Sequence, residues 1–199
     1  MPLTRPLVGT ATLVAVLLAF GAACGTTGGA RAVAGDSFAP IARVLRHPRC
    51  LNCHPSGDRP HVGDDARLHD MNVQRGLGGF GVPGMGCIAC HRDRNQDLAH
   101  VPGAPQWHLA PRSMGWQGLD DHGLAEALKD RARNGDRSLA ELREHMAVDP
   151  LVLWGWDPGV GREAVPMPHD RFLAALDAWI AAGAPSPAPG TTSHFGDPR

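Results

Sequence analysis

The sequence has no tyrosine, and aromatic residues make up only 5% of it. A chain of 199 residues with so few large apolar side chains can build only a modest hydrophobic core from its own residues. It is instead rich in glycine (25) and proline (18), which favours long connections between a few short elements. We therefore expect one domain, in which a large apolar cofactor could complete the core.

The sequence also lacks an excess of positive charge. Residues 1–34 hold two of the 19 basic residues and none of the 20 acidic ones, which leaves a formal charge of −3 for the rest. This balance argues against a nucleic-acid-binding protein, and no basic amphipathic stripe is present to hold the chain on a membrane surface. The absence of a G-x-S-x-G elbow, a P-loop and a dinucleotide-binding fingerprint gives no support to the enzyme classes that use them.

The N-terminus has the pattern of a targeting segment. Arg5 precedes an apolar run from Leu7 to Phe20, and small residues follow. This run is shorter than the roughly 20 apolar residues that a membrane-spanning helix needs. We expect export to the periplasm with residues 1–34 as a cleaved signal peptide. Two alternatives are a lipoprotein anchored through Cys24 and an uncleaved membrane anchor.

Helical spacing of apolar residues predicts four short helices. The first is expected at about residues 38–46. The second is expected to start after the acidic pair at 120–121 and to end at about residue 134. A third follows Ser138 and Glu141, which form a capping-box pattern, and a fourth covers about residues 170–182. The remainder is expected to be loop, with a disordered tail at 187–199.

Two C-x-x-C-H motifs carry the chemistry of this sequence. Each matches the attachment sequence of c-type haem. Two thiols three residues apart can form thioethers with the two vinyl groups of one porphyrin, and the next residue presents its imidazole to the iron. The motifs thus predict two covalent haem c groups, bound by Cys50 and Cys53 with His54 as proximal ligand, and by Cys87 and Cys90 with His91 as proximal ligand.

Two other interpretations use the same four cysteines. A zinc site is one, but the spacing between the pairs exceeds that of zinc ribbons. A pair of structural or redox disulfides is the other. Neither explains why a histidine follows both pairs, so we prefer haem.

Each haem iron needs a sixth ligand or leaves an open position. His69 lies in the loop between the motifs, and His108 has an aromatic and apolar setting. His145 is near the apolar face of the predicted third helix, and Met167 stands between two prolines ahead of the last helix. These four are the candidate distal ligands. Histidine would give a lower reduction potential than methionine, and an open position would permit peroxide, oxygen or gas binding.

Most of the chain, from Phe38 to Pro185, resembles a bacterial family of small dihaem cytochromes whose members often carry the name isoquinoline 1-oxidoreductase subunit. The segments that carry the resemblance are HPRCLNCHPSGDRP (47–60), GMGCIACH (84–91), VPGAPQWHLAP (101–111), ARNGDRSLAELREHMAVDPLVLWGWDPGVGRE (132–163) and AWIAAGAP (178–185). The resemblance includes both C-x-x-C-H motifs and draws attention to His69, His108 and His145. It implies a haem partner for a molybdenum hydroxylase with iron–sulfur clusters. This chain lacks the cysteines for such a cluster, so it would at most accept electrons from that enzyme.

The sequence thus predicts a mainly α domain at residues 35–186, with short helices and long loops packed around two haems. The expected function is periplasmic transfer of single electrons from a dehydrogenase to another cytochrome or the respiratory chain. In that function the chain is an electron-transfer protein or subunit rather than an enzyme in its own right. The alternatives are a small dihaem peroxidase with one open iron site and a haem-based gas sensor.

Overall fold

The computed structural model describes residues 37–196 together with Met1. The predicted signal peptide, with Cys24, and the last three residues of the predicted tail lie outside the described residues. Among the residues that are described, no helix is both long and apolar enough to cross a membrane.

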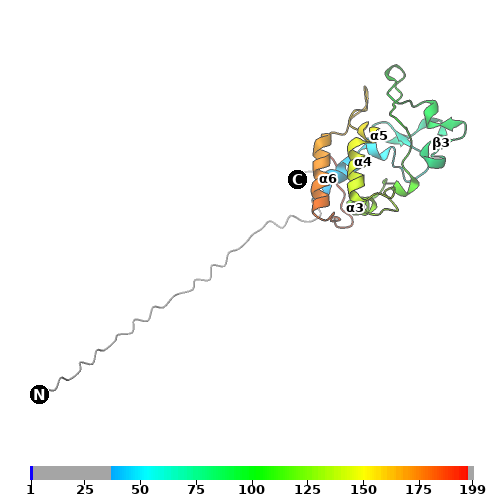
Figure 1. Ribbon diagram of the computed structural model, residues 1–199. Helices are drawn as coiled ribbons and strands as arrows, with labels where there is room; N and C mark the ends of the chain where they lie inside the picture. The colour runs from blue at the N-terminus through cyan, green and yellow to red at the C-terminus, as the bar shows by residue number, and fades with distance from the viewer. Residues whose placement is uncertain (2–36, 197–199) are drawn as a thin grey trace. The chain divides into compact units, whose positions relative to one another are not determined.

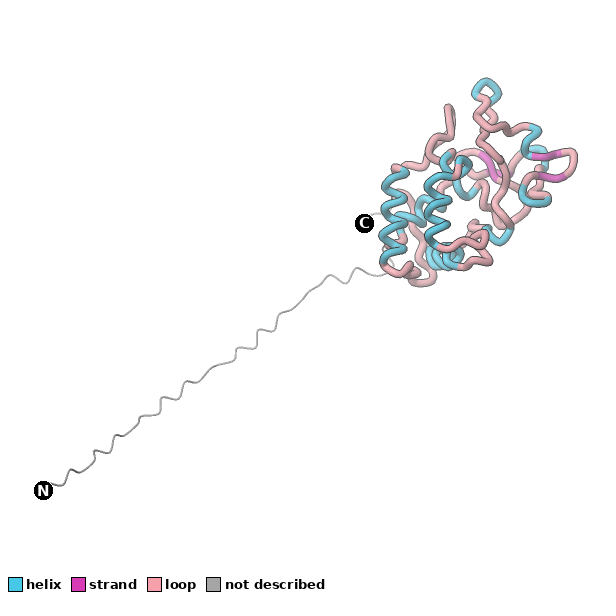
Figure 2. Tube along the Cα trace, in the orientation of Figure 1, coloured by secondary structure: helices cyan, strands magenta, loops and turns pink. Residues whose placement is uncertain are grey.

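Helices provide most of the regular structure in this part of the chain (Figures 1 and 2). The α-helices are α1 (Ala39–Leu45), α2 (Pro48–Leu51), α3 (Asp121–Lys129), α4 (Leu139–Val148), α5 (Pro150–Leu153) and α6 (His169–Ala181). Five 3-10 turns are η1 (Asp70–Asn72), η2 (Leu77–Gly79), η3 (Cys87–Ala89), η4 (Asp97–Ala99) and η5 (Arg112–Met114).

The strands form two short antiparallel hairpins. In the first, β1 (His61–Val62) pairs with β2 (Arg67–Leu68), so that His61 lies opposite Leu68. In the second, β3 (Gly81–Val82) pairs with β4 (Met85–Gly86). Both hairpins lie in the glycine-rich region that the sequence predicts to be loop.

The helix boundaries follow local capping chemistry. The Asp120 side chain accepts a hydrogen bond from the Gly123 main-chain N–H at 2.7 Å and starts α3, and Ser138 forms the predicted capping box with Glu141 at the start of α4. Helix α3, the second of the predicted helices, ends at Lys129, earlier than the expected residue 134. The Asn134 side chain donates a hydrogen bond to the Leu128 carbonyl and holds the chain after α3 in a turn.

Helices α1, α3, α4 and α6 enclose the hydrophobic core. Helix α1 packs against α3 and α6, and α4 packs against α3, α5 and α6. Figure 1 shows α4 and α6 side by side. The rings of Phe38 and Trp179 contact each other with centroids 5.1 Å apart, and both side chains are fully buried. This core holds the C-terminal helices against the helix that precedes the first C-x-x-C-H motif.

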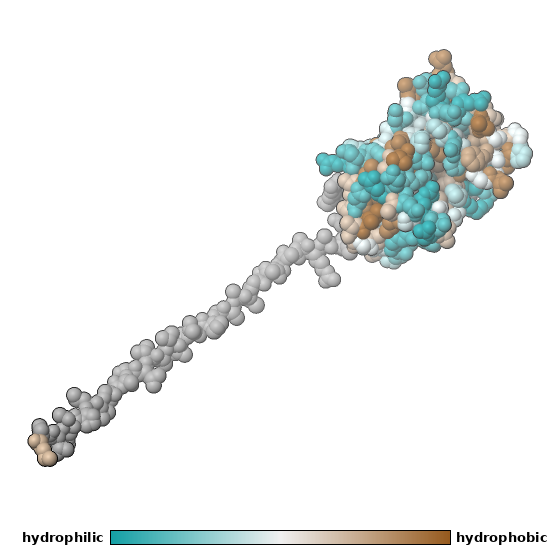
Figure 3. All heavy atoms as spheres, viewed as in Figure 1, coloured by the Kyte–Doolittle hydropathy of each residue, from teal (hydrophilic) through white to brown (hydrophobic). Residues whose placement is uncertain are grey.

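The region from residue 46 to residue 103 adds almost nothing to this core. Among the described residues, Pro55 is the only buried apolar side chain within this region. All the others lie before residue 46 or after residue 103. The region instead exposes large apolar side chains, namely Leu68, Met71, Leu77, Phe80, Ile88 and Leu98. Figure 3 shows hydrophobic residues standing among polar ones on the visible face. The half of the domain that contains the second motif therefore has no apolar core of its own.

The C-terminal segment differs from the disordered tail expected at 187–199. Ser193 is buried, and its hydroxyl donates to the Asp121 carboxylate at 2.7 Å. The main-chain N–H of Asp121 donates in turn to the Thr191 carbonyl at 2.8 Å. The expectation was wrong for residues 187–193, because polar contacts with α3 order a segment that its composition alone would leave loose.

Candidate functional site

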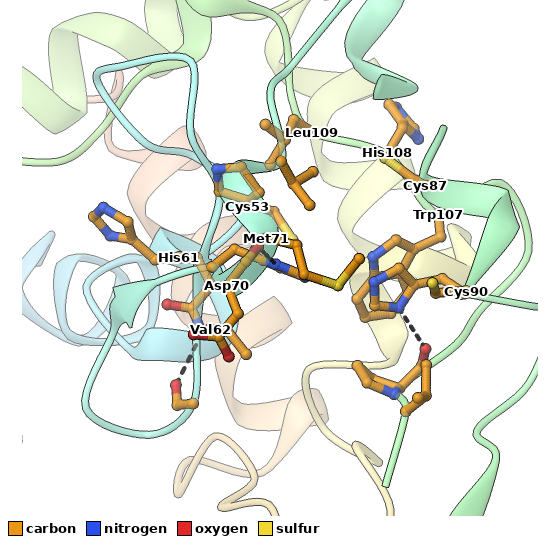
Figure 4. Close-up of a pocket in the computed structure, with 18 of the residues that line it drawn as sticks. Cys53, His61, Val62, Asp70, Met71, Cys87, Cys90, Trp107, His108 and Leu109 are labelled. Carbon is orange, nitrogen blue, oxygen red and sulfur yellow. Dashed lines mark hydrogen bonds between the residues drawn. The ribbon is translucent and has the colours of Figure 1, made fainter. Parts of the chain in front are cut away.

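A large cavity with a volume of ≈ 580 Å³ lies beside the second C-x-x-C-H motif. This volume is within the range of about 300–1,000 Å³ that is typical of cofactor and ligand sites. Its walls include Cys87, Cys90 and His91 of the motif. In Figure 4, Cys87 and Cys90 lie on one side of this space, His61 and Val62 of β1 lie on the opposite side, and Met71 projects between them.

His69 and His91 both line this cavity and lie close to each other. Their ring centroids are 6.1 Å apart, with 72° between the ring planes. A histidine nitrogen binds a first-row metal at about 2.0–2.1 Å. Two imidazoles that bind one iron from opposite sides therefore have ring centres about 6 Å apart. The predicted distal ligand His69 and the proximal ligand His91 are at the separation that an axial pair requires.

His91 is held in place by two contacts. Its Nδ1 lies 2.7 Å from the Pro102 carbonyl oxygen, and its ring stacks on the indole of Trp107 with centroids 4.7 Å apart and 10° between the planes. Burial lowers the pKa of the imidazole below its usual value. The ring is therefore neutral at pH 7, the form in which histidine binds metals.

A smaller cavity of ≈ 140 Å³ lies beside the first motif. It is lined by Cys50, Cys53 and His54 and by apolar residues of the helical core. The volume is below the range of typical cofactor sites. A haem at this position therefore requires the surrounding side chains to move apart, whereas the larger cavity is already open.

His54 repeats the arrangement of His91. Its Nδ1 lies 2.9 Å from the Met114 carbonyl oxygen, and its ring stacks on Trp116 with centroids 3.5 Å apart and 9° between the planes. The pKa of His54 is lowered to about 4, mainly by burial. Each motif histidine is thus neutral, stacked on one indole and fixed by one carbonyl.

The same ring nitrogen contacts a carbonyl oxygen in four of the five histidines that the sequence proposes as ligands. A carbonyl oxygen can only accept a hydrogen bond, so the Nδ1 of His54, His69, His91 and His108, which each contact one, carry the proton. Their Nε2 atoms are left with a lone pair for a metal. Metal-bound histidines almost always have this second contact. By contrast, His169 packs in the helical part of the domain and uses Nε2 to contact the Met146 carbonyl.

His145 and His108 both line the smaller cavity. His145 projects from α4, and its Nδ1 lies 3.4 Å from a carboxylate oxygen of Asp149. After burial and the Met114 contact, His145 has the next-largest effect on the pKa of His54, ahead of His108. His108 also lines the larger cavity, and its ring stacks on Phe80. The structure therefore brings both candidates to the first motif.

The two cavities share a wall. Arg49, Cys53, His108 and Trp154 line both of them. Aromatic contacts connect His91 to this shared wall. Trp107 stacks on His91 and also contacts Trp154 edge-on, with centroids 5.0 Å apart. A group bound in one cavity would therefore lie close to a group bound in the other.

The four cysteines of the motifs are free thiols. Burial raises the pKa of Cys50 to about 12 and that of Cys53 to about 11, and it also raises the pKa of Cys87. Among the described residues, no group of three or more histidine, cysteine, aspartate or glutamate side chains is arranged to hold a metal ion. An axial pair, as the sequence predicts for His69 and His91, would use only two side chains.

Met167 is the one proposed ligand that the structure places elsewhere. It packs against the hydrophobic core, its carbonyl accepts a hydrogen bond from the Trp156 indole, and it lines neither cavity. The structure therefore does not bring Met167 to either motif. The two prolines that flank it fix a loop on the core rather than over a cavity.

Sequence reasoning missed several residues of the site. Met71 lies in the larger cavity on a turn in which it and Asn72 both have positive φ angles, of 61° and 51°. Trp116 and Arg49 are also part of the walls. The position of Met71 two residues after His69 was the only available signal for it, and no spacing in the sequence pointed to Trp116.

Comparison of the chain with protein-family models, with curated proteins and with solved structures finds no match. The interpretation of the site consequently depends on the residues themselves.

Proposed function

We propose that the chain is a dihaem c-type cytochrome that transfers electrons one at a time. The main support for this proposal is the proximity of His69 and His91, whose ring centroids are 6.1 Å apart in the cavity that Cys87 and Cys90 also line. The fixed Nδ1 atoms of both rings leave each Nε2 free for an iron between them. The missing apolar core of residues 46–103 also suits a large apolar cofactor.

For the first site we propose that His54 is the proximal ligand and His145 the distal one. Both line the smaller cavity alone, whereas His108 lines both cavities. Cys50 and Cys53 would provide the thioether links. His108 then belongs to the wall between the two sites rather than to either iron.

The residues of the chain hold, orient and shield the two groups. A haem iron supplies one-electron chemistry when it is bound, because it changes between the ferrous and ferric states. The carbonyls of Met114 and Pro102 fix the orientation of His54 and His91, and the indoles beneath them limit ring rotation. The helical core keeps water from the first site. The contacts through Trp107 and Trp154 join the sites, which suits transfer between them.

The resemblance to small dihaem cytochromes extends the proposal to location and partners. The protein would work in the periplasm, accept electrons from a dehydrogenase, of which a molybdenum hydroxylase is one class, and pass them to another cytochrome or the respiratory chain. Two axial histidines per iron would give lower potentials than methionine ligation. Such a carrier has no substrate of its own to transform.

The test begins with expression in a host that attaches c-type haem, followed by intact mass, optical and low-temperature EPR measurements. We expect two covalent haems, both low-spin. A purified protein without haem would refute the proposal, and a persistent high-spin signal in the wild type would favour a peroxidase or gas sensor instead.

Substitution of the proposed ligands then assigns them. His69→Ala should leave one iron five-coordinate and high-spin, unless Met71 binds in its place and raises the potential. His69→Ala combined with Met71→Leu removes both donors and should give a high-spin signal for one haem. His122→Ala is the matched control, because the Nδ1 of His122 also contacts a carbonyl but the residue lines neither cavity. Two low-spin haems in the double variant would show that His69 is not a ligand.

A further inference from the structure

Two arginines line the larger cavity close to each other. The Arg49 side chain is 3% exposed, and its Nε is buried without a hydrogen-bond partner. Its guanidinium lies 5.6 Å from the ring centroid of Trp154 and pairs with Asp64. Arg162 lines the same cavity and donates to the carbonyls of Pro158 and His100, at 3.0 and 2.7 Å.

The two guanidiniums are not fully neutralised. The pKa of Arg162 is lowered, first by burial and next by the positive charge of Arg49. Asp97 and Asp64 act in the opposite direction but do not reverse the shift. Asp64 is itself 44% exposed, so its charge is partly screened by water. A buried arginine with an unpaired nitrogen next to a second arginine favours a further anion.

The position of this pair fits one part of the proposed cofactor. Arg49 pairs with Asp64, two residues after β1, and Figure 4 shows β1 on the side of the cavity opposite Cys87 and Cys90. In a porphyrin bound through thioethers, the two carboxylate-bearing propionates lie at the edge opposite the thioether links. An arginine presents a planar fork of donors that matches a carboxylate.

We propose that Arg49 and Arg162 form a carboxylate-binding subsite that receives the propionates of the haem attached at Cys87 and Cys90. This inference rests on the proposed function. The proposal also gives Arg49, which lines both cavities, an electrostatic effect on the haem iron. Its positive charge raises the reduction potential at the second site, because a nearby cation disfavours ferric iron more than ferrous iron.

The test compares the two midpoint potentials of the purified dihaem protein with those of Arg49→Gln, Arg162→Gln and the double variant. At about 10 Å and an effective dielectric constant of about 20, one charge changes an equilibrium by roughly tenfold. Each single variant should therefore lower the reduction equilibrium constant of one haem by about tenfold, or about 59 mV for a one-electron couple, and the double variant should lower it by about a hundredfold. Arg49→Lys keeps the charge and should recover most of this loss.

Arg94→Gln is the matched control, since Arg94 is an exposed arginine of the same half of the domain and lines neither cavity. Potentials in the double variant that equal those of this control would overturn the subsite. Loss of only the second haem from the double variant, seen as a mass with one haem, would support it. Arg162→Gln gives an independent reading, because its partly exposed side chain can be changed without opening the core. A wild-type mass without haem would instead refute the proposed function itself.

Discussion

The imidazole of His54 lies flat on the indole of Trp116, with 3.5 Å between the ring centroids and 9° between the planes. These residues are far apart in the sequence, and the main-chain N–H of Trp116 also donates to the His54 carbonyl at 3.0 Å. The second motif repeats the stacked arrangement through His91 and Trp107. Each C-x-x-C-H histidine is therefore positioned by a tryptophan from a later segment of the chain.

Removal of the first of these indoles should destabilise the protein and loosen His54. Trp116 is 3% exposed, and Trp→Ala at a buried position costs about 3–5 kcal/mol. We expect Trp116→Ala to lose that much free energy of unfolding in urea titrations and to broaden the EPR signal of one haem. Trp116→Phe keeps a smaller ring under the imidazole and should retain more of both properties. Equal stability of the alanine variant and the wild type would contradict the structural role.

The ion pair between Arg46 and Asp121 should contribute strongly to stability. Asp121 is fully buried, and it also accepts hydrogen bonds from the main chain and hydroxyl of Ser193. Asp121→Ala leaves the Arg46 guanidinium buried without its counter-charge, which typically costs about 3–5 kcal/mol. Chemical denaturation measures this loss. Ser193→Ala removes only one hydrogen bond and should cost about 1 kcal/mol; an equal loss in both variants would argue against a dominant role for the ion pair.

Acid should weaken the start of α3. Hydrogen bonds from the main-chain N–H groups of Gly123 and Gly190 lower the pKa of Asp120. Because the folded-state pKa is below that of the unfolded chain, this carboxylate stabilises the fold above the unfolded value of about 3.9, and the contribution is lost as the pH falls through the folded-state pKa. Asp120→Asn should therefore reduce the dependence of stability on pH below about 4. Melting curves of both proteins from pH 7 to pH 2 test this, and parallel pH profiles would contradict it.

A methyl group at Gly79 should displace the segment that carries His108. Gly79 has a φ of +84°, and a Cβ there would lie 2.1 Å from the Leu109 carbonyl oxygen, while the Gly79 carbonyl accepts from the Leu109 N–H at 2.9 Å. Gly79→Ala should cost more than about 1 kcal/mol. Gly84→Ala is the control, because Gly84 has a similar φ of +80° but nothing within 4 Å of the added Cβ. The difference in their unfolding free energies isolates the clash, and no difference would show that the segment can move freely.

The sequence predicted the elements that depend on local chemistry. The capping box of Ser138 and Glu141, the acidic start of α3 and the last helix were confirmed, because neighbouring residues determine them. Helix α1 begins after Phe38 without a side-chain cap, and Pro40 at its second position suits the first turn of a helix.

The site was predictable only in part. The C-x-x-C-H spacing indicated six of its side chains, and a position in the loop between the two motifs was enough to suggest His69. The stacking indoles, the carbonyls that hold each Nδ1 and the buried Arg49 depend on contacts between distant segments, which no periodicity reveals. The packing of Met167 on the core, away from both cavities, likewise depends on contacts between distant segments.

The scarcity of buried apolar side chains between residues 46 and 103 bears on how the protein matures. Under the proposed function, the helical part can form as soon as the chain is made, whereas the other half gains its core only when haem is attached. A chain that fails to receive its second haem therefore keeps long, poorly packed loops exposed, and such loops are the preferred targets of proteases. Degradation would thus remove incomplete molecules and leave the fully loaded carrier.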